Sequence, residues 1–158
     1  MSTHEVQVML VQPRWMATVP TWTSPDNLVK AAMGSSDQVW AFLGEHPEIS
    51  HPGTNIWLYR SPGSDEPNSG KGLHMEAGAE VHSEFKSDGP VVCRQTPGGQ
   101  VATVKHIGPY SGMGESHTAI RDWCQANHKT LSGTSWEVYG HWNEDESKLE
   151  TEIFYLLA

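Results

Sequence analysis

A carboxylate and a phenol stand two residues apart in the segment GTSWEVY, residues 133–139, where Glu137 precedes Tyr139. A carboxylate can pair with a cation or act as a general acid or base, and aromatic rings beside it add cation–π attraction. Earlier in the chain the segment GTNIWLY, residues 53–59, repeats Gly, Thr and Tyr at the same spacing. Trp57 occupies there the position that Glu137 occupies later, so one copy carries an aromatic ring where the other carries a charge.

Alternation along each segment predicts one apolar face and one face that could bind a ligand. We expect the apolar faces to pack under helices, and they carry Ile56, Leu58, Trp136 and Val138. The opposite faces carry the candidate ligand-binding residues Trp57, Tyr59, Glu137, Tyr139 and His141. If the two segments lie at equivalent positions, these residues form a groove that suits a cation with an apolar body. The same pattern also fits ordinary sheet packing with a solvated glutamate.

Eight strands and two helical regions are predicted to position these residues. Strands are expected at 5–12, 14–22, 53–59, 73–83, 89–96, 100–107, 133–139 and 149–157. Residues 61–72, a polar stretch rich in Pro, Gly and Ser, are expected to form a loop. The second helix follows GPYSGMG, residues 108–114, and runs to about residue 128.

The first helix has a clear start and a predicted interruption. Ser24 and Pro25 are typical of a helix N-terminus, and Pro47 ends the helix. Residues 34–37, Gly-Ser-Ser-Asp, predict a break, after which Ser36 caps a second piece. The apolar stripe of the first piece consists of Leu28, Val29, Ala32 and Met33.

The predicted elements read strand, helix, strand, strand, and then repeat. The offset that aligns the two heptads also pairs Trp40 with Ile120 and Leu43 with Trp123. Small gaps pair residues 17–19 with 102–104, and residues 80–81 with 152–153. Internal repeats take priority in reading a fold. We therefore predict one α+β domain over residues 1–158, made of two pseudo-twofold strand-helix-strand-strand modules at about 1–88 and 89–158, with an antiparallel sheet, one long helix per half and a central ligand groove.

Bulk composition excludes several classes of protein. The net charge of −9 and the lack of a Lys/Arg cluster argue against direct nucleic-acid binding. No apolar stretch is long enough to span a membrane, and the N-terminus MSTHEVQVML does not have the pattern of a signal peptide. Two cysteines, Cys93 and Cys124, fit free thiols in the cytoplasm. The nine histidines show no metal-binding spacing and are expected at the surface, so neither a metal nor a cofactor is expected.

The segments VATVKHIGPYSGMGESHTAIRDWC, WEVYG and ETEIFYLL resemble the GyrI-like small-molecule-binding domain. This domain is also the effector-binding domain of multidrug-responsive bacterial transcription regulators. The resemblance covers nearly the whole chain and implies two modules about a pseudo-twofold axis with a ligand groove between them. In drug-responsive members an acidic residue that corresponds to Glu137 meets cationic ligands, with Tyr139 beside it. A subgroup hydrolyses strained cyclopropane rings of alkylating natural products, and its acid and aromatic residues correspond to the same two positions.

Three functions follow from this reading, in order of preference. The first is a stand-alone binder of apolar or cationic small molecules, without an attached DNA-binding domain. The second is a hydrolase of reactive electrophiles of the cyclopropane type, in which Glu137 activates water and Tyr139 orients it or donates a proton. The third is a protein-interaction or inhibitor module with a protein partner.

Overall fold

The computed structural model describes residues 5–60, 73–87 and 89–158, so the predicted loop at 61–72 lies outside the described residues. The strands are β1 (Gln7–Val11), β2 (Trp15–Thr23), β3 (Asn55–Arg60), β4 (Leu73–Glu80), β5 (Val92–Gln95), β6 (Gly99–Ile107), β7 (Leu131–Tyr139) and β8 (Glu150–Leu157). The α-helices are α1 (Leu28–Glu45) and α2 (Met113–Ala126). Neither helix of the described residues has the length and apolar character that a membrane span requires.

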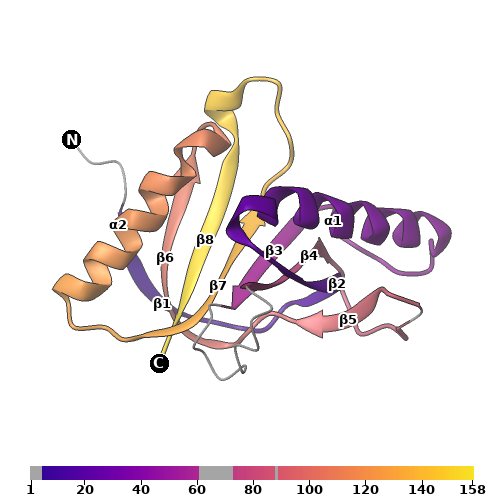
Figure 1. Cartoon of the computed structure of the whole chain (residues 1–158), viewed down its shortest axis with the longest axis horizontal. Coiled ribbons are helices and arrows are strands. Elements are labelled where there is room, and N and C mark those ends of the chain that lie inside the picture. The colour runs from indigo at the N-terminus through magenta and orange to yellow at the C-terminus, as the bar shows by residue number, and fades with distance from the viewer. Residues whose placement is uncertain (1–4, 61–72, 88) are drawn as a thin grey trace.

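All the strands join one antiparallel sheet in the order β1-β6-β8-β7-β3-β4-β2-β5. The order is symmetric about the central β7–β3 pair, and each half of the sheet carries one helix. α1 lies against β4 and β2, and α2 lies against β6 and β8, and Figure 1 shows the two helices over opposite halves of the sheet. The predicted fold class, α+β with an antiparallel sheet and one long helix per half, is confirmed.

The first strand of each half of the chain lies in the opposite half of the sheet. β1 pairs with β6, whereas β5 pairs with β2. The halves of the chain are therefore interlocked at the two outer edges of the sheet, as well as joined at its centre.

Strand registers define which residues are equivalent in the two halves. Trp57 pairs with Ala77, which pairs with Val19, and Glu137 pairs with Ile153, which pairs with Val104. The predicted alignment of residues 17–19 with 102–104 agrees with these registers. The alignment of residues 80–81 with 152–153 is wrong, because Ala77 is the residue that corresponds to Ile153.

Two buried threonines make the same hydrogen bond in the two halves. Thr18 Oγ1 donates to the Ala77 carbonyl at 3.0 Å, and Thr103 Oγ1 donates to the Ile153 carbonyl at 2.7 Å. The corresponding positions thus share contacts as well as strand register.

The predicted break in the first helix is wrong, since α1 continues through residues 34–37. Ser35 is buried against the sheet, and a Cβ built on Gly34 would meet nothing within 4 Å. Packing of the helix face onto the sheet thereby outweighs the weak helix propensity of this stretch.

The two helices correspond with a shift of one residue from the predicted alignment. Buried positions of α1 fall at residues 32, 35, 39, 42 and 43, and the buried positions of α2, at 113, 116, 120 and 124, match 32, 35, 39 and 43. Val39 therefore corresponds to Ile120 and Leu43 to Cys124. The predicted pairs of Trp40 with Ile120 and Leu43 with Trp123 are wrong by one position.

The apolar faces of β3 and β7 are buried, but by strands and not by helices. Ile56, Leu58, Trp136 and Val138 pack in a cluster with Met16, Val101 and Phe154, all of them strand residues. β2 and β6 are not neighbours in the sheet, so their side chains share one cluster because the sheet curls strongly around this face. The prediction that this face lies under helices is wrong.

The helices cover the face of the sheet that carries Trp57 and Glu137. Trp57 and Tyr59 pack against Ala32 of α1, and Glu137 contacts His117 of α2. Trp57 and Glu137 are cross-strand partners and so point to the same side of the sheet. The middle of this face lies between the two helices.

Candidate functional site

A cavity of about 700 Å³ lies above β3 and β7, between the two helices. Its lining residues are Leu28, Val29, Met33, Ser36, Asp37, Gly53, Asn55, Trp57, Tyr59, Tyr110, Met113, Glu137, Tyr139, Gly140, His141 and Trp142. We call this cavity the central groove. Its size falls within the range of small-molecule sites, which is about 300–1,000 Å³.

Glu137 lies in the floor of the central groove and is only 5% exposed. Its Oε1 atom accepts hydrogen bonds from the hydroxyl groups of Tyr59 at 2.8 Å and Tyr139 at 2.6 Å. Burial, and then the neighbouring carboxylate, raise the pKa of both tyrosines above the usual value for this side chain. Both phenols therefore stay protonated at neutral pH and act as donors.

The second carboxylate oxygen ends a chain of hydrogen bonds that begins at Arg121. Arg121 Nη1 can only donate, and it does so to the Tyr155 hydroxyl oxygen at 3.0 Å. The Tyr155 hydroxyl oxygen lies 2.6 Å from His117 Nδ1, and His117 Nε2 donates to Glu137 Oε2 at 2.6 Å.

Three donors thus compensate Glu137 for the water that it loses on burial: the hydroxyl groups of Tyr59 and Tyr139 and the ring of His117. Among the described residues, its one ion-pair-distance neighbour is His117. The groove floor therefore holds an anion that is well hydrogen-bonded and not neutralised by lysine or arginine.

Aromatic rings surround this carboxylate. Trp57 and Tyr139 meet edge to face with ring centroids 5.5 Å apart, and Tyr110 meets Tyr139 in the same way at 5.5 Å. Trp142 and Tyr110 remain 72% and 43% exposed at the rim. The walls can therefore contact flat apolar groups and attract cations through their ring faces.

One face of α1 forms a wall of the central groove. Val29, Met33, Ser36 and Asp37 follow helical spacing, and all four line the cavity. Val29 and Met33 are 58% and 55% exposed, so the prediction that they belong to the apolar core stripe is wrong. These side chains are exposed because they face the cavity and not the sheet.

All five side chains proposed from the sequence, Trp57, Tyr59, Glu137, Tyr139 and His141, line the central groove. Their roles in binding or catalysis stay a prediction. What the sequence did predict is their common location, because strand alternation places residues two apart on one face.

The sequence reading missed His117, Tyr155 and Arg121, which hold Glu137 from α2 and β8. Histidines were expected at the surface, but His117 is part-buried and His106 is buried, bonding Ser116 and the Pro109 carbonyl. The signal in the sequence is the spacing of four residues between His117 and Arg121, which places both side chains on one face of the second helix.

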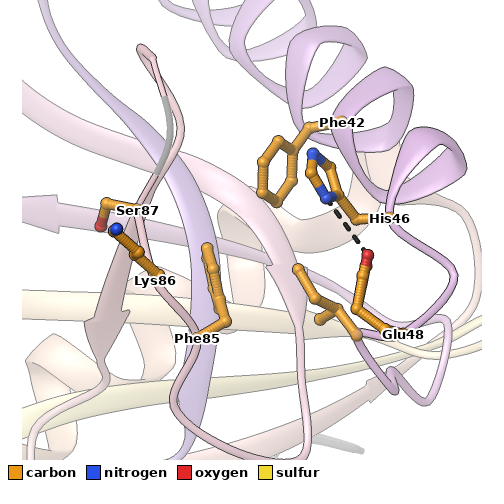
Figure 2. Close-up of a pocket in the computed structure, with 7 residues that line it drawn as sticks. Phe42, His46, Glu48, Phe85, Lys86 and Ser87 are labelled. Carbon is orange, nitrogen blue, oxygen red and sulfur yellow. Dashed lines mark hydrogen bonds and ion pairs between the residues drawn. The ribbon is translucent and has the colours of Figure 1, made fainter.

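A second cavity, of about 410 Å³, lies at the C-terminal end of α1. Figure 2 shows Phe42 beside His46, with Glu48 bonded to His46 at 3.2 Å, and the ring of Phe85 lies 5.6 Å from that of Phe42. Glu48 is exposed, so its charge is solvated. Within the described residues, no three His, Cys, Asp or Glu side chains are grouped as a metal site requires. The central groove is therefore the stronger candidate site.

Solved structures share this fold. The EcmrR C-terminal domain matches with a TM-score of 0.75 and 17% sequence identity, over 99% of this chain and 99% of that one. SAV2435 bound to tetraphenylphosphonium matches with a TM-score of 0.65 and 10% identity, over 98% and 94%. A hydrolase encoded by lin2189 from Listeria innocua matches with a TM-score of 0.60 and 10% identity, over 98% and 92%. At such identities the likeness concerns the fold.

A search of curated proteins by sequence found no match. The model of one protein family, the GyrI-like small molecule binding domain, matches residues 30–157. That range contains both helices except the first two residues of α1, the central strands β3 and β7, and every residue that lines the central groove apart from Leu28 and Val29. The chain therefore belongs to the GyrI-like small-molecule-binding domain family.

Proposed function

We propose that the protein binds lipophilic cationic molecules in the central groove, as a multidrug-type binder. One observation carries the proposal: Glu137 is a buried carboxylate in an aromatic groove, and no lysine or arginine among the described residues pairs with it. A bound cation would pair with this carboxylate, while Trp57 and Trp142 contact its apolar body.

The acidity of the groove supports a cation over a neutral or anionic ligand. Its lining residues include the two acids Asp37 and Glu137, and neither lysine nor arginine is among the lining residues that the structure describes. In addition, a fold relative, SAV2435, has been solved with tetraphenylphosphonium bound, which is a lipophilic cation.

Glu137→Gln tests the proposal, because it keeps the shape of the side chain and removes its charge. We expect affinity for a cationic dye such as rhodamine 6G to fall by about 1–3 kcal/mol, which is roughly 5- to 150-fold. Fluorescence titration measures the change. Affinity for the neutral dye Nile red should change much less.

Glu84→Gln is the matched control, because Glu84 is exposed and is not among the residues that line the groove. It changes the net charge equally and should leave rhodamine affinity unaltered. Equal losses in both variants would show that only the overall charge attracts the dye, and an unaltered Glu137→Gln would reject the proposal.

Hydrolysis of a cyclopropane-type electrophile is the second candidate, favoured by the 2.6 Å contact between Tyr139 and Glu137 in the groove floor. Glu137 would take a proton from water as the water oxygen bonds to the ring carbon. In the same step the ring C–C bond breaks and its electron pair moves to a conjugated carbonyl, whose oxygen receives a proton from Tyr139. Here Glu137→Gln should slow hydrolysis of a spirocyclopropyl dienone roughly 100-fold while leaving its binding nearly intact.

We further propose that the chain arose by internal duplication of modules at about 1–88 and 89–158. The symmetric strand order and the matching bonds of Thr18 and Thr103 support this origin. A cytoplasmic location is also proposed, since Cys93 and Cys124 are free thiols and fit a reducing compartment.

A further inference from the structure

The central groove carries two carboxylates at different depths. Glu137 lies in the floor, and Asp37 lies on the exposed side of α1 and also lines the cavity. Trp40 Nε1 donates to Asn55 Oδ1 at 2.7 Å, which places this turn of α1 over the Asn55 end of β3. Trp57, the partner of Glu137, is two residues further along β3, or about 7 Å. The two charges are therefore separated both along the groove and in depth.

Asp37 has no structural partner that would account for it. Within the described part of the chain it forms neither an ion pair nor a side-chain hydrogen bond. It stands in the interior of α1, where aspartate is a weak helix former and cannot cap the helix. Its carboxylate is therefore free to meet a ligand.

Apolar surface connects the two charges. Met33 and Val29 lie on the same helix face as Asp37, and Trp57 and Trp142 line the same cavity. A volume of about 700 Å³ lies in the upper half of the range for ligand sites, which leaves room for an elongated molecule.

We propose that the central groove selects elongated dications, with one cationic centre near Glu137 and the second near Asp37. This inference rests on the proposed function, because it assumes that Glu137 receives a cation. The hydrocarbon linker of such a ligand lies along Met33 and Trp57. Trp142 and Tyr110, exposed at the rim, add aromatic faces for the outer cationic group.

The experiment compares the bis-quinolinium dication dequalinium with a mono-quinolinium that carries the same alkyl chain. Isothermal titration calorimetry gives both affinities for the native chain and for Asp37→Asn. We expect Asp37→Asn to weaken dication binding by about 5-fold, the upper end for an exposed ion pair, and monocation binding by less than about 2-fold. Bis-quinolinium ions with linkers of increasing length should show an optimum that disappears in Asp37→Asn.

Asp122→Asn is the matched control, since Asp122 is exposed on α2 and does not line the groove. It should leave the ratio of the two affinities unchanged. The inference is overturned if Asp37→Asn changes neither affinity, or changes both by the same factor. If Glu137→Gln leaves monocation binding intact, the proposed function itself is rejected; if only the Asp37 effect is missing, the dication inference alone is rejected.

Discussion

At the scale of single residues, the Trp57–Glu137 pair is the distinctive feature of the groove. The two residues are equivalent in the two halves and also face each other directly across β3 and β7. The pseudo-twofold axis therefore passes between them. Tyr59 and Tyr139, which are related by the same axis, both donate to Glu137 Oε1. The symmetric scaffold thus directs two donors to one oxygen, and the single carboxylate makes the site asymmetric.

His117 is predicted to stabilise the fold through Glu137. His117→Leu removes the donor to Oε2 and leaves a buried carboxylate partly unsatisfied, so the free energy of unfolding should fall by about 1–3 kcal/mol. Urea titration measures the loss. The exposed His82→Leu serves as the control and should change stability little.

A double variant separates this explanation from lost packing. Glu137→Met, alone and added to His117→Leu, completes a double-mutant cycle, in which the loss of the Tyr59 and Tyr139 hydrogen bonds to Glu137 is common to both Glu137 variants. The loss of stability in the double variant should therefore be smaller than the sum of the two single losses, by about 0.5–3 kcal/mol. Additive losses would contradict the claim that the two side chains act as a pair.

The sequence predicted which residues line the groove, but it did not predict the chain of hydrogen bonds that reaches Glu137 from α2 and β8. Trp57, Tyr59, Glu137, Tyr139 and His141 follow from strand alternation, which is a local rule. The contacts of His117 and Tyr155 with Glu137 depend on how α2 and β8 come together. Such pairings join distant segments and leave no periodic signal in one sequence.

At the scale of elements, α1 and the central strands β3 and β7 show why some predictions about the fold failed. Alternation and turn residues placed the strands well, because these signals are local. Which face of the sheet the helices cover depends on the curl of the whole sheet. The sequences of β3 and β7 carry large apolar side chains on both faces, so alternation alone does not tell which face lies under the helices. The break expected at Gly34 failed because burial of Ser35 favours a continuous helix.

Gly78 of β4 and Gly34 of α1 should respond in opposite ways to replacement by alanine. A Cβ at Gly78 of β4 would overlap the carbonyl oxygen of Ala17, where β2 and β4 approach closely. Gly78→Ala should therefore cost about 3 kcal/mol, the upper end for overpacking. Gly34→Ala meets open space in a continuous helix and should stabilise by about 0.5–1 kcal/mol.

Thermal and urea unfolding of the two variants measure these changes. A destabilising Gly34→Ala would indicate that α1 is interrupted there after all. A neutral Gly78→Ala would show that the two strands can separate without cost.

At the scale of the whole molecule, the symmetric sheet makes the two halves of the groove interchangeable in principle. The residue of α1 that corresponds to His117 is Ser36, with the one-residue shift that the buried helix positions define. Ser36 lines the central groove. On the other side of the axis, the position that corresponds to His117 therefore holds a serine in place of a histidine.

Exchange of the central pair tests this equivalence. The double variant Trp57→Glu with Glu137→Trp moves the carboxylate to β3, within reach of the same two tyrosines, but without a histidine. Its affinity for rhodamine 6G should be about 10-fold lower, the loss expected for one hydrogen bond to a charged group. Adding Ser36→His should recover most of the lost affinity.

Ser36→His in the native background is the control and should not strengthen binding. If the triple variant binds no better than the double variant, residue 36 of α1 and residue 117 of α2 are not equivalent positions about the axis. Thermal unfolding of each variant verifies that the comparison is made between folded proteins.

The position of Trp57 and Glu137 on the axis also bears on how such a site can arise at all. A homodimer of identical half-length chains would place two copies of one side chain there, either two rings or two like charges in direct contact. Two adjacent buried carboxylates would repel each other, and two tryptophans would carry no charge. A lone anion at the centre of symmetry therefore requires two halves that differ in sequence at this position, as the two halves of this chain do.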